Sequence, residues 1–242
     1  LPMIIMLYQL CPQKFRKFVL LLANYAFFFI WSKFFLVYQV ITMLITYVSA
    51  KVIDHTANKK TKKISLFIAI VINLGVLVVL KYTNFFGENI FAIFHQPFTP
   101  VRLIAPIGIS YYTLQMISYL MDTSSGKIHS DHSIVDFAVY ANFFPTLIQG
   151  PITRFNEIKD SIHAGNPITY QNLKFGSQRI LFGLMKKMII ADRLDPAVSK
   201  IFTSYTQDGL FSLIGAVLCT IQLYMDFSGI VDICLGSAEI FG

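Results

Sequence analysis

The chain has 242 residues, of which 55% are hydrophobic and only 14% are charged, and its formal net charge is +7. Soluble domains are about 45–50% apolar and about 25% charged, so this composition excludes an ordinary soluble domain. Charge-free runs cover residues 34–50, 64–80, 103–121 and 209–225. Runs of this length suit the roughly 17–25 residues that cross a bilayer core, and they predict a multi-pass membrane protein.

The basic residues indicate membrane topology and no nucleic-acid partner, because they lie beside apolar segments at Lys14–Lys17 and Lys59–Lys63. Lysine and arginine beside membrane spans gather on the cytoplasmic side, where we expect both clusters. One straight helix over residues 18–50 would be too long for a bilayer at about 1.5 Å per residue. We therefore expect two helices that are broken near Trp31–Lys33.

The next segments alternate between apolar and polar character. Residues 64–82 are expected to span the membrane, residues 84–95 to lie at its interface, and residues 107–121 to span it again. A polar loop is expected over residues 123–135.

Residues 137–155 are apolar but contain two prolines and a glycine. Non-helical backbone at membrane depth must be enclosed by protein or water, so a short or re-entrant element is expected here. A polar loop over 156–172, an amphipathic helix over 175–193 and an apolar stretch from Leu210 follow. The predicted fold is all-α, a polytopic transmembrane helical bundle with tilted, broken and interfacial helices in one membrane-embedded domain over residues 1–242.

One polar stripe lies on the helix expected at residues 107–121. Gln115, Ser118 and Asp122 follow Tyr111 at helical spacing and so share one face. Two interpretations stay open. The stripe either forms hydrogen bonds that hold the helices together or lines a polar channel.

The stretch IQLYMDFSGIVDICLG places Asp226 and Asp232 in an otherwise apolar segment, with Gln222 and Ser228 on the same faces. An isolated buried carboxylate tends to take up a proton, so these aspartates are expected to have partners. The glycines beside them, such as Gly229, indicate either close helix contact or a local break.

Arg154, Lys186 and Lys187 are the candidate partners of these aspartates. Arg179, Lys186 and Arg193 also recur at intervals of seven, which is typical of a basic amphipathic helix. Such a helix lies on a membrane surface or attracts an anionic thioester donor, and the first interpretation is favoured.

The histidines suggest no catalytic or metal site. His129 and His132 belong to a short HSDH stretch that is more consistent with a solvated loop than with a metal site. The sequence contains no G-x-S-x-G elbow, P-loop or G-x-G-x-x-G motif. We therefore predict no metal, no bound cofactor and no catalytic residue in this chain.

Four motifs carry a resemblance to a known family: PIGISYYTLQMISYLMD, FFPTLIQGPITRF, GLMKKMIIADRL and IQLYMDFSGIVDICLG. In this order and spacing they resemble the membrane-bound O-acyltransferase family, and within it the branch of the bacterial alginate O-acetyltransferases. The resemblance covers nearly the whole chain.

The resemblance implies a multi-pass protein of the bacterial inner membrane that passes an acyl group, acetyl in this branch, to a hydroxyl of a cell-surface polysaccharide. The implied donor is a cytoplasmic acyl thioester, acetyl-CoA or an acyl carrier protein, and the implied partners include an extracytoplasmic acyltransferase. The residues expected to line the substrate path or to brace it are Gln115, Ser118, Asp122, Arg154, Lys186, Lys187, Gln222, Asp226, Ser228 and Asp232.

Two departures from the family pattern matter. The family usually follows the first-motif aspartate with Tyr-Arg-Gly, whereas Asp122 is followed by TSSG. The family's catalytic histidine follows the fourth motif in a Trp-His context, and none of the five histidines matches it. We therefore expect an N-terminal portion of a longer enzyme, inactive alone, with its catalytic histidine beyond residue 242.

Three alternatives stay open. D-alanyl transfer to teichoic acid is an activity of the same family. A membrane transporter would use the polar stripes as a permeation route, and a non-catalytic relative would serve as a scaffold.

Overall fold

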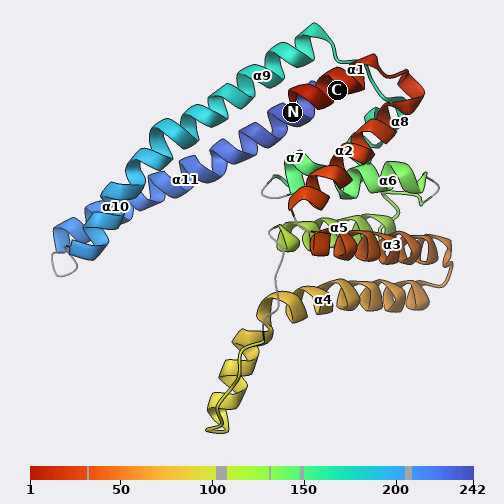
Figure 1. The fold of residues 1–242 in the computed structure, drawn as a ribbon. Coiled ribbons are helices and arrows are strands. Elements are labelled where there is room, and N and C mark those ends of the chain that lie inside the picture. Colours follow the sequence, from red (N-terminus) through yellow and green to blue (C-terminus); the bar gives the residue numbers. More distant parts are fainter. Residues whose placement is uncertain (32, 102–107, 131, 148–149, 205–208) are drawn as a thin grey trace. The chain divides into compact units, whose positions relative to one another are not determined.

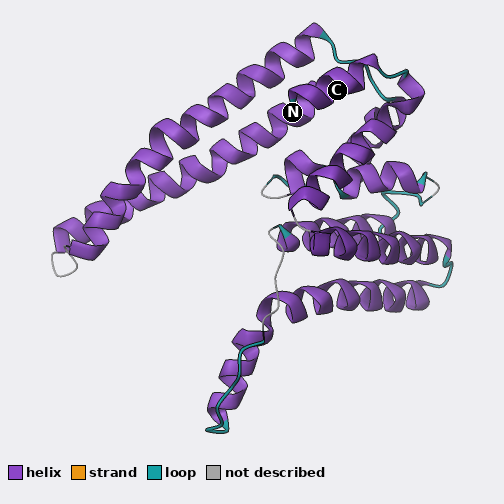
Figure 2. Ribbon diagram, in the orientation of Figure 1, coloured by secondary structure: helices purple, strands orange, loops and turns teal. Residues whose placement is uncertain are grey.

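The computed structural model describes residues 1–31, 33–101, 108–130, 132–147, 150–204 and 209–242. All regular elements in these ranges are helices (Figure 2), which confirms the predicted all-α class. The chain divides into two compact units, unit 1 with Leu1–Ile148 and Ile152–Gly165, and unit 2 with Gln149–Pro151 and Asn166–Gly242. The single membrane-embedded domain stays a prediction.

The helices of each unit follow one another along the chain (Figure 1). Unit 1 contains α1 (Pro2–Leu10), η1 (Gln13–Phe15), α2 (Arg16–Trp31), α3 (Lys33–His55), α4 (Lys59–Ile93), α5 (Ile109–Ser124), α6 (Ile134–Ala141), α7 (Phe144–Leu147) and α8 (Phe155–Ala164). Unit 2 contains α9 (Tyr170–Leu184), the π-helical segment η2 (Met185–Ala191), α10 (Asp192–Ser204) and α11 (Gly209–Ile240).

Three helices in the described part of the chain are long and apolar enough to cross a membrane: Leu36–His55 within α3, all of α4, and all of α11. They contain, in this order, the second helix predicted within residues 18–50, the span predicted at 64–82 and the apolar stretch predicted from Leu210. These three helices identify a membrane protein. The helix α4 continues through residues 84–93 and bends on the way (Figure 1). That this part lies at the interface stays a prediction. The first residue of the expected 107–121 span lies outside the described residues.

The core of unit 1 forms around α5, which lies beside α3 and α4 (Figure 1). Met116, Tyr119 and Leu120 are buried at helical spacing below Tyr112. The Tyr112 hydroxyl donates to the Gln39 carbonyl of α3 at 2.9 Å and accepts from the Thr42 hydroxyl at 3.2 Å. These hydrogen bonds join α3 to α5 in surroundings where lipid offers no partner.

The segment after α5 is broken, as its prolines predicted, into the short helices α6 and α7. The polar loop predicted over residues 156–172 is wrong in its first half, because α8 occupies Phe155–Ala164. Phe155, Ile158 and Ile162 lie at i, i+3 and i+7 and pack on the core. Gly165 then ends the helix in the left-handed conformation, with φ of 60°.

In unit 2, α9 and α11 lie side by side and touch through glycines (Figure 1). A Cβ atom added to Gly183 would lie 2.5 Å from the carbonyl oxygen of Gly229, and one added to Gly236 would lie 2.6 Å from that of Gly176. Small residues let helix backbones approach closely in membranes. Of the two interpretations of these glycines, the structure shows close contact, since α11 is continuous through Gly229.

Gly183→Ala should destabilise the α9–α11 contact by about 1–3 kcal/mol, because the backbone carbonyl opposite cannot move away easily. The matched control is Gly75→Ala in α4, where an added Cβ meets nothing within 4 Å. That control should be neutral or stabilise by up to about 1 kcal/mol, because alanine favours the helix over glycine. The measurement is thermal unfolding of the full-length protein in detergent. Equal unfolding midpoints for the two variants would contradict the glycine contact.

Candidate functional site

The ten candidate residues fall into two groups, one in each unit, and each group is described by itself. The group in unit 1 consists of Gln115, Ser118, Asp122 and Arg154. The group in unit 2 consists of Lys186, Lys187, Gln222, Asp226, Ser228 and Asp232.

Asp122 in unit 1 is buried near the end of α5 and has two cationic neighbours. Its Oδ1 lies 3.3 Å from Nη1 of Arg154 and 3.7 Å from Nζ of Lys127. Arg154, a candidate partner for the aspartates of α11, pairs with Asp122 of its own unit. Both cations are more exposed than the carboxylate, so Asp122 anchors them at the surface of the unit.

Gln115 lies about two turns before Asp122 on the same helix and is also buried. Its Nε2 donates to the carbonyl oxygen of Tyr140 at 3.1 Å, which joins α5 to α6. Ser118 is half-buried between these two residues. Of the two interpretations of the polar stripe, these contacts support hydrogen bonding between elements for Gln115 and Asp122.

His132 has a role that the sequence did not indicate. Its Nδ1 lies 3.1 Å from the carbonyl oxygen of His129, which can only accept, so Nδ1 donates. Nε2 then accepts from the Tyr119 hydroxyl at 2.9 Å, and the ring packs on Phe155 with centroids 4.3 Å apart. His132 lies in the expected loop between α5 and α6, with its ring half-buried against Phe155, while Asp131 lies outside the described residues.

Two further observations concern polar groups that the motifs did not indicate. The Gln39 side chain on α3 is fully buried, and neither of its amide atoms has a hydrogen-bond partner in the part of the chain that the structure describes. Across the described ranges, no three His, Cys, Asp or Glu residues are grouped so that they could hold a metal ion.

Asp232 in unit 2 binds two cations from α9 and η2. Nζ of Lys186 lies 2.6 Å from its Oδ2, and Nε of Arg179 lies 3.3 Å from its Oδ1. The same Lys186 ammonium donates to the Ser228 hydroxyl at 2.9 Å. Both Lys186 and Asp232 are largely buried, so the predicted partner is confirmed for Lys186, and Arg179 is a second partner that was missed.

Asp226 forms the second ion pair, with Lys187 at 2.5 Å between Nζ and Oδ1. Lys187 also lies 3.5 Å from Asp192 at the start of α10. One turn away, Nε2 of Gln222 donates to Oδ1 of Asp195 at 2.8 Å. The Lys187 prediction is confirmed, and the contacts of α11 extend from α9 through η2 to α10.

The π-helical segment η2 explains how two consecutive lysines reach the same neighbouring helix. Successive residues of an α-helix point about 100° apart, yet Lys186 and Lys187 both bind aspartates of α11. The wider turn of η2 covers both lysines. Such segments are rare within helices and frequent at functional sites.

The charges of this group are neutralised within unit 2. Arg179, Lys186 and Lys187 each have a carboxylate partner on α11, so these cations face α11. A carboxylate held by cations is a poor general base, because removing a proton from substrate would require losing those contacts. The arrangement is suited to fixing helices in place, which supports the bracing interpretation of Asp226 and Asp232.

Comparison with known proteins found no family model that matches the chain. The chain is 32% identical over 249 residues to the probable alginate O-acetylase AlgI of Pseudomonas aeruginosa, covering 100% of this chain and 47% of that protein. It is 30% identical to the peptidoglycan O-acetyltransferase of Helicobacter pylori, over 94% of this chain and 48% of that protein. It is 26% identical to the teichoic acid D-alanyltransferase of Bacillus subtilis, over 61% of this chain and 38% of that protein. The chain thus spans about half the length of the curated relatives that it matches over its full length.

Asp232→Asn should destabilise the protein by about 2 kcal/mol or more, because it leaves two cations without their carboxylate in a largely buried place. Asp160→Asn is the matched control, since Asp160 is exposed on α8 and its change should stay within about 0.5 kcal/mol. Thermal unfolding in detergent measures both. A shift no larger for Asp232→Asn than for Asp160→Asn would show that the ion pairs do not hold the helices.

Proposed function

We propose that this chain, a member of the membrane-bound O-acyltransferase family, forms part of an enzyme that transfers an acyl group to a hydroxyl of a cell-surface polysaccharide. The observation that carries the proposal is the 32% identity to an alginate O-acetylase over the whole of this chain. The peptidoglycan O-acetyltransferase of Helicobacter pylori matches almost as fully. Both names describe acetyl transfer to a glycan, although the glycans differ.

Acetyl is the proposed acyl group. The acetylases match 94% or more of this chain at about 30% identity, whereas the D-alanyltransferase of Bacillus subtilis matches 61% of it at 26%. The proposal extends to a cytoplasmic thioester donor, acetyl-CoA or an acyl carrier protein. It also includes a bacterial inner-membrane location and a partner acyltransferase outside the membrane that completes delivery to the glycan.

The residues described above support the reaction by holding helices, not by moving protons. Acyl transfer to a hydroxyl needs a general base whose pKa lies near the working pH, a role that histidine fills well. Asp226 and Asp232 are each bound by cations, and Asp122 is bound by Arg154. The proposal therefore leaves the general base to a histidine outside this chain, as the family pattern implies.

Deleting the gene in its native bacterium should remove most of the ester-linked acetate from one cell-surface polysaccharide. Mild alkali releases such esters, and the freed acetate can be quantified against total glycan. The full-length gene should restore the acetate, and an Asp160→Asn copy should do so equally well. An unchanged acetate content in the deletion strain would refute the proposed acetyl transfer.

D-alanyl transfer is the second candidate, and the match to the Bacillus subtilis enzyme favours it over unrelated functions. The same alkaline hydrolysate distinguishes the two, because D-alanine and acetate are separate products. Loss of D-alanine alone would indicate the second activity. Loss of neither would favour transport or a scaffold role.

A further inference from the structure

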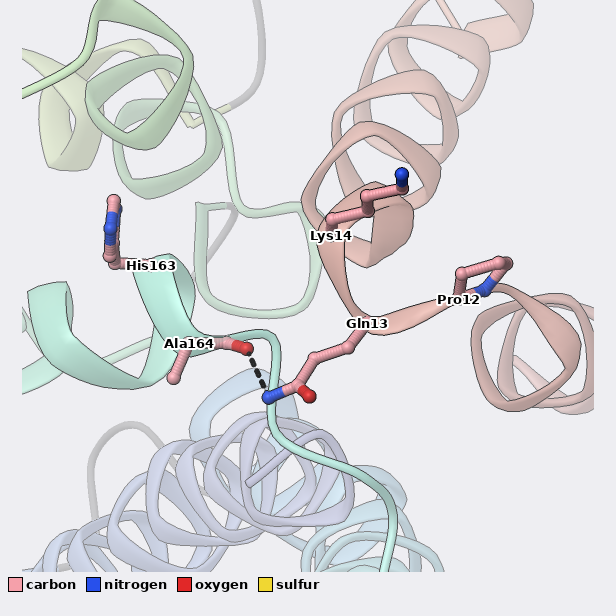
Figure 3. Close-up of a pocket in the computed structure, with 5 residues that line it drawn as sticks. All are labelled: Pro12, Gln13, Lys14, His163 and Ala164. Atoms are coloured by element: carbon pink, nitrogen blue, oxygen red, sulfur yellow. Dashed lines mark hydrogen bonds between the residues drawn. The ribbon is translucent and has the colours of Figure 1, made fainter.

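Two surface features of unit 1 have no part in the contacts described above. One is a depression of about 500 Å³ between η1 and α8. Its two sides are joined by a hydrogen bond from Nε2 of Gln13 to the carbonyl oxygen of Ala164 at 2.9 Å (Figure 3), so this feature connects η1 to α8. The other feature is an exposed apolar face near the end of α4.

The end of α4 and the segment that follows it form a finger over residues 82–101 (Figure 1, yellow). The helix ends at Ile93, and the chain turns at His95, whose φ is 54°. Asn84 fixes the returning segment. Its Nδ2 donates to the carbonyl oxygen of Val101 and its Oδ1 accepts from the Val101 N–H, both at 2.9 Å.

An aromatic contact holds the returning segment against one face of the helix. The Phe98 ring packs on the Phe91 ring with centroids 5.3 Å apart. A Cβ atom on Gly87 would collide with the Phe98 ring, so only glycine permits this approach. The finger therefore covers this face of the helix with its own chain.

Another face of the same helix carries an apolar stripe. Its members recur at i, i+4, i+8, i+11 and i+12 and are between 38% and 74% exposed: Tyr82, Phe86, Ile90, Ile93 and Phe94. The Tyr82 hydroxyl is the one polar side-chain group in the stripe. At about 100° per residue, Glu88 lies on the opposite side of the helix, where it is exposed.

The helix α4 is longer than the core of a bilayer is thick. Its 35 residues extend about 52 Å at about 1.5 Å per residue, against about 30 Å of hydrocarbon. The charge-free run 64–80 fills this core, and Lys81 and Tyr82 follow it, residue types that suit the interface. The helix begins with the basic cluster Lys59–Lys63, which belongs on the cytoplasmic side. The finger then emerges on the other side.

We propose that the finger lies along the extracytoplasmic surface of the membrane, with the apolar stripe among the lipid chains and Glu88 toward water. The stripe continues the membrane-spanning part of the same helix, and α4 bends on the way (Figure 1), which turns the finger along the surface. An amphipathic helix with an aromatic face is suited to this position. The proposal assigns a face and a side to the interfacial position predicted for residues 84–95.

The composition of the stripe favours lipid over a protein partner. Protein interfaces contain about one hydrogen bond per 100–200 Å², whereas the stripe presents a single hydroxyl among its five side chains. Lipid chains require no hydrogen bond from the face that they cover. The polar groups of the finger, such as Asn84 and Glu88, lie outside the stripe.

Photo-crosslinking of the full-length protein in native membranes tests the lipid contact. Benzoylphenylalanine is placed at Phe86 or Phe94, and adducts are identified by intact-protein mass spectrometry after irradiation. Both positions should gain the mass of a phospholipid as often as Phe67, an exposed position in the span of α4. Glu88 is the matched control on the opposite side of the helix and should gain it severalfold less often. Phe94 is 70% exposed, so the probe removes little packing there and this variant should fold normally.

Either of two results would overturn the lipid contact. The stripe positions could gain phospholipid no more often than Glu88, or their main adduct could be another protein. Neither result would bear on the proposed acyl transfer, which does not depend on the finger.

Cysteine labelling in right-side-out membrane vesicles tests the side of the membrane. Glu88→Cys should react with a membrane-impermeant maleimide in intact vesicles, above the level of the wild type, because position 88 faces water on the outer side. Lys63→Cys, in the basic cluster at the start of α4, should gain label only after the vesicles are opened. A Glu88→Cys variant that is labelled only in opened vesicles would refute the extracytoplasmic position.

Discussion

A polar group on a membrane-spanning helix must find its partner within the protein, because hydrocarbon offers none. This constraint applies to Asp226 and Asp232 on the helix α11. Their carboxylates are bound by Arg179, Lys186 and Lys187 of the neighbouring helices. The short distances of these ion pairs require α9 and α11 to lie close together, and the close approach is possible because glycines of the two helices contact each other's backbone. Charge pairing in unit 2 therefore depends on the close packing of the two helices.

The same constraint applies to unit 1, where most buried polar groups are hydrogen-bonded to neutral groups. The hydroxyl of Tyr112 connects α3 and α5, and the Thr46 hydroxyl donates to the Asn73 side chain to connect α3 and α4. Asp122 is bound at the end of α5 by Arg154. The buried amide of Gln39 is one exception, since neither of its side-chain atoms has a partner among the described residues. Nδ2 of Asn24 and Oδ1 of Asn142 are likewise buried without a partner among the described residues, and such unsatisfied groups mark places where a water or a ligand would be stabilised.

The sequence predicted most of the elements because charges and prolines interrupt its apolar runs. The span in α4 and the lysine partners of α11 both followed from such local patterns. The helix α8 was missed although Phe155, Ile158 and Ile162 carry its apolar spacing, because the polar residues between them dominated the composition. The Arg179–Asp232 pair and the packing of His132 depend on helix register and tertiary contact, which no local pattern contains. The π-helical turn at Lys186 was not predicted either. It is found where two consecutive lysines bind aspartates of the same neighbouring helix.

The glycines of α9 and α11 are seven residues apart on each helix, and this spacing has a consequence for how the antiparallel pair aligns. Gly176 meets Gly236 and Gly183 meets Gly229. A slip of seven residues would still bring Gly183 against Gly236, so the glycines alone would tolerate a second alignment. In that alignment Ile233 would stand where Asp226 now pairs with Lys187, so Lys187 would lose its carboxylate, whereas Lys186 would exchange Asp232 for Glu239. The glycines thus set how near the helices lie, and the charges select which of the possible alignments forms.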